Sequence, residues 1–321
     1  MDNERLIIDF WDVGQGDCSV IHLPDDELIL IDVGPLGSPV VDWLANHPHL
    51  RIRSIILTHN DRDHAGALTS LVHCCTGRIG TLYVMADRNV KTPAFQHLYR
   101  AANAAYQKGG IAHIQRLEAP HTLWSSCTGC LRLDVKHPTM TANVLAKSAN
   151  ETSAVIVLSS AQGESVVWAG DTSMTNVAAV AANKNTVAML GPHHGAPEDR
   201  KQPQFAEHLT KVSPGMVIAS VGSHNQYGHP CVGFVRRVRK NGARFLCTQI
   251  TKHCEQPKRL QHVFKGAAWL GLPQNSTGFS CRGPVRLAFN GHSFVSDTIA
   301  NQKHKSALQN VSKPKCMPDA D

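Results

Sequence analysis

Short apolar runs separated by turn residues fill the first part of the chain. Residues 6–34 hold three of them, LIIDFWDV, SVIHL and LILIDVG, separated by the turn sequences GQGD and PDDE. Dense aliphatic and β-branched runs broken by Gly, Pro and Asp are typical of a strand meander. GQGD lacks the Lys-Ser/Thr ending of a phosphate-binding loop and the spacing of a dinucleotide fingerprint, so it is interpreted as a tight hairpin turn.

Strands and helices then alternate. Helical spacing occurs at 38–48 and 93–109, and a helix is expected to begin near His64. Apolar strands are expected at RSIILTH, TLYVMA, SAVIVLS, SVVWA, TVAMLG, MVIASVG and PVRLAF. The alternation predicts a mixed α/β fold whose strands are buried between layers.

Several of these strands end in polar loops that carry His or Asp. RSIILTH opens into residues 59–64, HNDRDH, and SVVWA is followed by Gly170-Asp171. TVAMLG ends at Pro192-His193-His194-Gly195, and residues 224–230 follow MVIASVG. Loops on a rigid scaffold commonly hold the chemistry of a protein, so we expect a functional site there.

The HNDRDH loop has the residue types of a metal site. It places His59, Asp61, Asp63 and His64 on one tight turn. Mixtures of imidazole and carboxylate suit zinc, manganese or iron, and a larger carboxylate share favours manganese. The alternative, a solvated polar turn with incidental histidines, is disfavoured by the other His- and Asp-bearing loops.

The order of these motifs resembles the metallo-β-lactamase superfamily, whose usual motif is His-x-His-x-Asp-His after a strand. Asp61 replaces the second histidine, as in the hydrolase (nuclease) domain of the ComEC family of DNA-uptake proteins and in pneumococcal-type phosphorylcholine esterases. FWDVGQGDCSVIHLPDDELILIDVG, NETSAVIVLSS, VVWAGDTS, GPHHGA and SVGSHNQYGHP carry the likeness to ComEC, from about residue 6 to about 250. The resemblance implies an αββα four-layer sandwich, without the membrane segments of ComEC.

The resemblance also implies a two-metal site, with Zn or Mn as the ions. His59 and Asp61 would hold one ion, Asp63 and His64 the second, and Asp171 would bridge them. One histidine of the next pair would complete the second site, with His194 preferred over His193. Asp32 and Asp17 are implied to support the site. The family also has a third-motif histidine before the strand pair that leads to the bridging Asp, and it is missing here. His137 and Asn150 are the candidates to replace it, and Asn150 is nearer the expected spacing to Asp171.

Such a site predicts hydrolysis. Two cations about 3.5–4 Å apart lower the pKa of a bridging water and hold the attacked oxygen. Asp63 and His229 are the expected catalytic residues, with His229 donating a proton to the leaving oxygen or binding a phosphate oxygen. His224 and Tyr227 are candidate substrate contacts. The alternative for His229 is a structural loop histidine before proline.

Charge adds a candidate partner. The chain has 321 residues, 42% of them hydrophobic, which is enough for a core, and its net charge of +7 favours a polyanion. Arg236 and Arg237 begin a basic helical stretch after the YGHP loop and could bind phosphates, although a solvated basic face is the alternative. We expect a nucleic acid substrate, in particular DNA; partner proteins are not predicted.

Ten cysteines without an export signal predict free thiols or metal ligands and argue against a disulfide framework. Cys127-x-x-Cys130 has the spacing of half a zinc knuckle. A second candidate group comprises Cys247, His253, Cys254, His262 and Cys281. We expect an additional structural zinc at Cys247, Cys254 and Cys281, with unpaired thiols as the alternative.

We expect three parts in the chain: a hydrolase domain at 1–250, an extension packed on it at 251–298, and a disordered tail at 299–321. No run approaches the roughly 20 apolar residues of a membrane-spanning helix, and MDNERL does not resemble a signal peptide, so we expect a cytoplasmic protein that does not contact membranes.

The expected function is that of a metal-dependent phosphodiesterase or nuclease that cleaves DNA with a metal-bridging hydroxide. One alternative is a hydrolase of small phosphodiesters or other esters, like the phosphorylcholine esterases; another is a regulatory protein without catalysis. β-Lactamase activity is disfavoured because Asp61 changes the usual zinc site. Metal content would separate an enzyme from a regulatory protein.

Overall fold

The computed structural model describes residues 5–85, 93–182, 185–196, 204–254, 272, 278–309, 311 and 313–316. His262, residues 255–271 and 273–277 of the expected extension, and the last residues of the expected tail lie outside these ranges. No helix in the described ranges is both long enough and apolar enough to cross a lipid bilayer.

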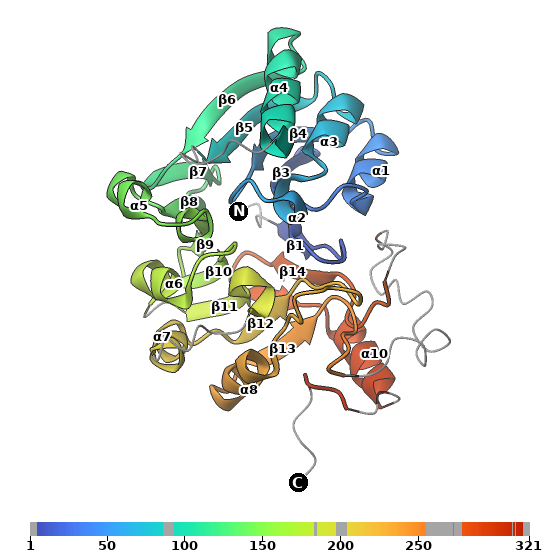
Figure 1. The fold of residues 1–321 in the computed structure, drawn as a ribbon, viewed down its shortest axis with the longest axis vertical. Helices are drawn as coiled ribbons and strands as arrows, with labels where there is room; N and C mark the ends of the chain where they lie inside the picture. Colours follow the sequence, from blue (N-terminus) through green and yellow to red (C-terminus); the bar gives the residue numbers. More distant parts are fainter. Residues whose placement is uncertain are drawn as a thin grey trace.

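The first sheet has eight strands in the order β15-β14-β1-β2-β3-β4-β5-β6 (Figure 1). From β15 to β3 neighbouring strands are antiparallel, and from β3 to β6 they are parallel. The strands are β1 (Leu6–Phe10), β2 (Cys18–His22), β3 (Glu27–Val33), β4 (Arg51–Ile56), β5 (Ile79–Met85), β6 (Ile111–Leu117), β14 (Val285–Phe289) and β15 (Phe294–Ser296).

The second sheet has seven strands in the order β13-β12-β11-β10-β9-β8-β7. Strands β13 to β10 run parallel, and β10 to β7 are antiparallel. The strands are β7 (His121–Ser125), β8 (Leu131–His137), β9 (Val155–Ser160), β10 (Glu164–Trp168), β11 (Asn185–Leu190), β12 (Met216–Ala219) and β13 (Arg244–Cys247).

Helices cover the outer faces of both sheets (Figure 1). The α-helices are α1 (Pro39–Ala45), α2 (Arg62–Ala65), α3 (Leu68–Cys74), α4 (Pro93–Gln107), α5 (Met140–Leu145), α6 (Met174–Ala181), α7 (Phe205–Val212), α8 (Val232–Lys240) and α10 (Thr298–Leu308). Two 3-10 turns, η1 (Asn150–Thr152) and η2 (Pro192–Gly195), complete the described elements.

Three apolar clusters define the layers. One lies between the sheets, where Phe10 of β1 stacks on Trp168 of β10 with ring centroids 5.8 Å apart. The second joins the first sheet to α1, α3 and α4, and the third joins the second sheet to α6, α7, α8 and α10. Burial of one face of each helix against a sheet therefore produces four layers. The predicted αββα sandwich is confirmed.

The C-terminal part differs from the expectation. Residues 298–308 form helix α10, so disorder from residue 299 is a wrong prediction for this segment. The Asp297 carboxylate accepts a hydrogen bond from the Ala300 amide at 2.9 Å, which caps the helix, and Ala300, His304 and Leu308 are buried. The lysines lie on the exposed side, which is why the composition resembled that of a tail.

Candidate metal centre

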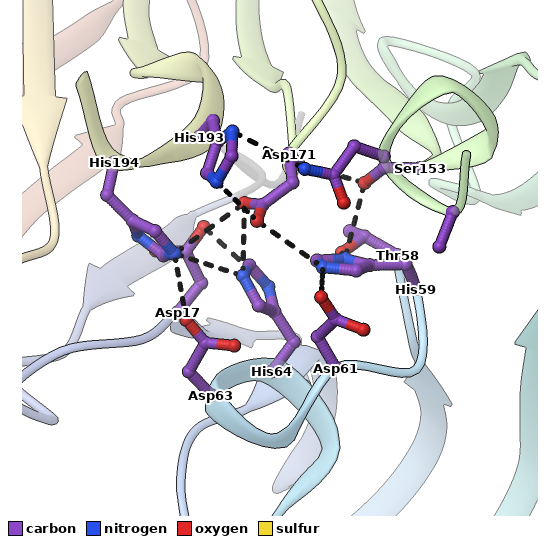
Figure 2. Close-up of polar contacts among 12 residues, drawn as sticks. Asp17, Thr58, His59, Asp61, Asp63, His64, Ser153, Asp171, His193 and His194 are labelled. Carbon is purple, nitrogen blue, oxygen red and sulfur yellow. Dashed lines mark hydrogen bonds and ion pairs between the residues drawn. The ribbon is translucent and has the colours of Figure 1, made fainter. Parts of the chain in front are cut away.

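Loops from both sheets meet at the carboxyl ends of the parallel strands. His59 follows β4, and Asp63 and His64 lie in α2 just after it. Asp171 follows β10, and His194 lies in η2 after β11. Figure 2 shows the side chains of these residues pointing toward one another. The fold thus brings together residues that are more than 130 positions apart.

His64 occupies the middle of the cluster. Its Nε2 lies 3.2 Å from Oδ1 of Asp171 and 3.2 Å from Nε2 of His194. His194 in turn approaches Asp63, with 3.3 Å from Nε2 to Oδ2, and Asp17, with 3.2 Å from Nδ1 to Oδ1. His64 and His194 are fully buried, so these contacts are shielded from water.

The other half of the cluster surrounds His59. Its Nε2 lies 3.5 Å from Oδ2 of Asp171 and 3.8 Å from Oδ2 of Asp61, whose side chain is 54% exposed. The His59 and His64 rings are 4.0 Å apart between centroids. Asp171 therefore stands between the two halves, with one oxygen toward each.

The two histidines of η2 are placed differently. His193 is 40% exposed in its side chain and approaches only Oδ2 of Asp171, at 3.5 Å, among the carboxylates of the described residues. His194 is buried and contacts Asp17, Asp63 and Asp171. The structure thus places His194 deeper in the cluster than His193.

The Asp32 carboxylate contacts Thr58 and His64, on either side of the start of the HNDRDH loop. Its carboxylate accepts hydrogen bonds from the amide and hydroxyl of Thr58 at 2.8 and 2.7 Å, and its Oδ2 lies 2.8 Å from Nδ1 of His64. A carboxylate bonded to the second ring nitrogen fixes the orientation of an imidazole and leaves the first nitrogen for a ligand.

Ser153 is a positioning residue that the sequence did not reveal. Its hydroxyl accepts a hydrogen bond from the Asp171 amide at 2.9 Å and lies 3.3 Å from Nδ1 of His59. The hydroxyl of Thr58 lies 3.1 Å from the same nitrogen of His59. A serine at the start of an apolar strand gives no sequence signal, because only the fold places it beside the cluster.

Two glycines allow the loops to approach. A Cβ on Gly16, whose φ is +136°, would lie 2.1 Å from the Asp63 carbonyl oxygen, and one on Gly170, whose φ is +50°, would lie 2.2 Å from the Ser153 hydroxyl. Gly16 therefore lets Asp17 reach the cluster. The amide of Asp17 donates a hydrogen bond to the Asp63 carbonyl at 3.2 Å.

Three residues of the site have positive φ although they are not glycine: Asp32 at 55°, His193 at 48° and His194 at 53°. Such a backbone costs about 1–3 kcal/mol for each residue and persists where the surroundings determine it. The His193 amide donates to the Gly170 carbonyl at 2.9 Å, which helps to hold η2 in this form.

The donor set fits divalent cations. Two groups have ligand atoms within 4.8 Å of one another: His59, His64 and Asp171, and Asp17, His64 and His194. Among the described residues, the buried atoms without a hydrogen-bond partner include Nε2 of His59 and Oδ1 of Asp171. Since buried polar atoms are normally satisfied, these lone atoms are consistent with metal ligands. Carboxylates and imidazoles suit zinc or manganese.

The charges of the cluster compensate one another. Burial would lower the pKa of His194, but the charges of Asp17 and Asp171 raise it to about 10, and Asp171 and Asp32 likewise raise the pKa of His64 despite its burial. Burial opposes a low pKa for Asp63, yet His194 and His64 bring it to about 2. Protonated histidines thus supply the positive charge that the carboxylates require, and a cation held by these residues would supply it in their place.

His229 stands at the edge of the cluster. Its ring centroid is 5.4 Å from that of His193 and 6.4 Å from that of His194. Tyr227, 71% exposed, stacks on His229 with 5.6 Å between centroids. Burial and the charges of His193 and His194 lower the pKa of His229 to about 4. His224 is exposed and packs its ring against Phe279, 5.9 Å away.

The two candidates for the third motif lie in different places. Asn150 approaches the site, with its Nδ2 3.4 Å from Nδ1 of His193. His137 directs its Nε2 to the Glu151 carbonyl at 2.8 Å, and burial lowers its pKa. Among the described His, Cys, Asp and Glu residues, the groups of metal-site size do not include His137.

The basic residues lie on the far part of α8. This helix begins beside the site, because the Cys231 amide donates to the Gly195 carbonyl at 2.8 Å. Arg236 and Arg237 are exposed, and Arg237 belongs to the last turn. At 1.5 Å of rise per residue they lie about 8–9 Å along the helix from Cys231. Only a ligand that extends beyond the His and Asp cluster would contact both the cluster and these two arginines.

The Cys and His residues considered as zinc ligands do not form a single group. Cys127 is exposed, and neither it nor Cys130 belongs to a group of metal-site size in the described part of the chain. The Nε2 of His253 lies 3.0 Å from the Gly228 carbonyl, which places that ring beside the YGHP loop. Cys247 and Cys281 are buried, and Cys254 is partly buried.

Comparison with known proteins supports the superfamily resemblance in part of the chain. The family model described as metallo-beta-lactamase superfamily matches residues 11–75, a segment that contains Asp17, Asp32 and the HNDRDH loop. A search of curated proteins finds no match.

Several solved structures are similar to this chain. The metallo-beta-lactamase fold protein YhfI from Bacillus subtilis is 13% identical with a TM-score of 0.47, over 76% of this chain and 95% of that one. Unliganded yeast PDE1 is 9% identical with a TM-score of 0.46, over 75% and 97%. A long form RNase Z from yeast is 9% identical with a TM-score of 0.41, over 71% and 39%.

Proposed function

We propose that this protein is a metal-dependent hydrolase of phosphodiester bonds and that its substrate is DNA, as in the ComEC family that the sequence resembles. The observation that carries the proposal is the buried cluster in which His64 belongs to both ligand groups and Asp171 stands between them. A cluster of this kind, open to solvent at Asp61 and His193, has the donors of a two-cation site and a side from which a substrate can enter.

The side chains divide the work by position. His59, Asp61 and Asp171 would hold one cation, and Asp63, His64 and His194 the other, with Asp17 beside His194. Zinc or manganese bound there would supply Lewis acidity, which polarises a phosphoryl oxygen and acidifies a water molecule. Asp32 and Ser153 keep the ligands in place, because each is bonded to the loop that carries them.

His229 and its neighbours would meet the substrate. The His229 ring lies at the rim of the cluster, where it can hydrogen-bond a phosphate oxygen or pass a proton to the leaving oxygen. The exposed ring of Tyr227 stacked on it can contact the same phosphate or a neighbouring nucleotide. Arg236 and Arg237 would then neutralise phosphates farther along a polymer.

The test is metal-dependent cleavage. Metal-free protein is restored with Mn²⁺ or Zn²⁺ and incubated with end-labelled single- and double-stranded DNA and RNA, and with bis(p-nitrophenyl) phosphate. Asp63→Ala and His64→Ala should lose more than the roughly 10–100-fold that is typical for a residue that only supports a ligand. Asp26→Asn, a change of an exposed turn acid, is the matched control.

Each outcome decides between the candidates. DNA cleavage that needs metal and is lost in both variants supports the proposal. Cleavage of the small diester alone would replace DNA by a small phosphodiester, and cleavage of RNA alone would replace it by RNA. Bound metal with no cleavage of any substrate would favour a regulatory protein, and no bound metal would overturn the hydrolase itself.

A further inference from the structure

A second group of metal-ligand side chains lies where the C-terminal segment packs on the second sheet. The donor atoms of Cys281, His304 and Cys316 lie within 4.8 Å of one another. The Sγ of Cys281 is 3.4 Å from Nε2 of His304. Cys281 and His304 are buried, with 3% and 2% of their surface exposed. This group is separate in sequence and in chemistry from the His and Asp cluster.

Two more thiols belong to the same region. Cys247 ends β13, and Cys254 follows seven residues later. Cys247 and Cys281 are members of the apolar cluster on the outer face of the second sheet, and Cys254 and Cys316 pack against it. Cys247 and Cys254 therefore lie at the same apolar cluster as the group of Cys281, His304 and Cys316.

Backbone bonds fix the segments that carry these side chains. The Arg282 amide donates to the Cys247 carbonyl at 3.0 Å and the Cys281 amide to the Thr248 carbonyl at 2.8 Å, which ties residues 281–282 to the end of β13. Arg239 of α8 donates to the Lys315 carbonyl at 3.2 Å and so holds the residue before Cys316. The positions of the donors are thus set by the fold.

A buried cation beside the group points to negative charge there. The Arg282 side chain is fully buried and bonds only neutral partners among the described residues, the Pro284 carbonyl at 2.7 Å and the Asn301 amide oxygen at 3.4 Å. Its Nη2 has no hydrogen-bond partner there. The charge of Arg244 repels Arg282 and that of Asp297 attracts it, so the buried charge is only partly compensated, which is costly. Zn²⁺ with three thiolates and one imidazole has a net charge of −1 and would offset Arg282.

We propose that Cys281, His304 and Cys316, together with either Cys247 or Cys254, bind a structural Zn²⁺ ion. Three thiolates and one imidazole form a closed tetrahedral set that is typical of structural zinc, and soft thiolates select zinc over manganese. The ion would join β13, the segment before β14, helix α10 and the C-terminal residues. The sequence expectation included Cys247, Cys254 and Cys281 but not His304 or Cys316.

Cobalt bound by thiolates has an absorption that the His and Asp cluster, which has no sulfur ligand, cannot produce. The full-length protein with His59→Ala and His194→Ala is loaded with Co²⁺ under reducing conditions. We expect about one equivalent of metal and the near-ultraviolet thiolate-to-cobalt absorption of a tetrahedral, sulfur-rich site. Adding Cys316→Ser or His304→Ala should remove this absorption. Adding Cys127→Ser, a change of an exposed cysteine, should leave it unchanged.

Three results would overturn the proposal. The first is cobalt binding without thiolate absorption, and the second is absorption that persists in the Cys316→Ser protein. The third is a mass two hydrogens lower in the zinc-supplemented protein with Cys281 joined to Cys316, because these sulfurs would then form a disulfide. Cys316 is only partly buried, so its replacement by serine should leave the fold intact, which melting temperature will show.

Separate Cys247→Ser and Cys254→Ser variants identify the fourth ligand. Weakened cobalt absorption in one of them supports the four-ligand site and names the residue. Unchanged absorption in both would overturn the closed site. Because no residue of the His and Asp cluster is involved, the result does not depend on whether the protein cleaves DNA.

Discussion

At the residue scale, Asp32 shows how one buried side chain can organise several loops. It accepts two hydrogen bonds from Thr58 and lies 2.8 Å from Nδ1 of His64, and its own φ is positive. Among the described residues, Asp32 does not contact the solvent-exposed members of the cluster, so it acts on metal binding through His64. Its removal should therefore weaken metal binding while the fold persists.

We expect Asp32→Asn to lower the affinity for zinc by about 10–100-fold, because asparagine keeps the volume but not the charge beside His64. A competition titration with a chromophoric chelator measures this. Asp25→Asn is the matched control, since Asp25 also has positive φ (62°) but is exposed in a turn. Equal zinc affinities in the two variants would contradict the positioning role.

Gly16 offers a test of loop approach. In Gly16→Ala, the new Cβ would collide with the Asp63 carbonyl oxygen, so the loops carrying Asp17 and Asp63 must move apart. Gly37→Ala shares the cost of positive φ, about 1–2 kcal/mol, but meets no atom within 4 Å. We expect both variants to lose stability in urea unfolding and only Gly16→Ala to lose metal affinity as well. Normal metal affinity in Gly16→Ala would show that the close approach is dispensable.

Sequence reasoning works at this scale where ligands are adjacent in the chain. His59, Asp61, Asp63 and His64 could be singled out because four donors stand in six positions. Ser153, His304 and Cys316 could not, since each is an ordinary residue of its segment until the fold brings it to a partner. The choice between His193 and His194 likewise depends on which side chain turns inward.

At the scale of elements, β14 is attached to the first sheet by charge as well as by backbone pairing. Arg286 lies opposite Asp9 in the register of β14 and β1 and forms two bonds to its carboxylate, at 2.6 and 2.7 Å. His22 of β2 lies 2.9 Å from the same carboxylate, which is fully buried. Three neighbouring strands therefore meet at one carboxylate.

This carboxylate should make stability depend on pH in acid. Burial alone would raise the pKa of Asp9, but Arg286 and His22 outweigh it and hold the pKa below its usual value. For a lowered carboxyl pKa, the stabilisation is present above the unfolded value of about 3.9 and is lost as the pH falls through the folded value. Urea unfolding between pH 7 and pH 3 should show this decline, and Asp9→Asn should flatten it.

At pH 7 we expect Asp9→Asn to cost about 3 kcal/mol, because it leaves a partly buried arginine without its partner. Glu27→Gln removes a carboxylate from an exposed pair with Arg53 and should cost less than about 1 kcal/mol. Equal losses in the two variants would show that burial adds nothing to the Asp9 contact.

The strands that were predictable are those with continuous apolar runs. The apolar runs that became β1, β3, β4, β9, β10 and β11 were found, because central strands leave few polar positions. β6 and β7 were missed, because only the two ends of β6 are buried and no residue of β7 is, so neither shows an apolar run. β8 was also missed although most of it is buried, because charged residues interrupt its apolar positions, and so were the short strands β13 and β15. Helix α10 was missed although its buried residues recur every four positions.

At the scale of the whole molecule, the two sheets share one core that is closed by the C-terminal strands. Val285, Leu287 and Phe289 of β14 and Phe294 of β15 belong to the apolar cluster between the sheets. Strand β14 lies in the expected extension at 251–298 and pairs with β1 of the expected hydrolase domain at 1–250. The two expected parts therefore share one sheet. A chain without these strands would expose the edge of β1 and part of the core.

A chain that ends at residue 282 should consequently fail to fold. Each buried apolar side chain contributes about 1.5–3 kcal/mol, so the loss of four removes about 6–12 kcal/mol, close to the whole stability of a typical domain. A chain that ends at residue 309 keeps β14, β15 and α10 and should unfold cooperatively. Circular dichroism during urea titration compares the two; a cooperative transition in the shorter chain would show that residues 1–282 have a complete core of their own and that the C-terminal strands are an appendage.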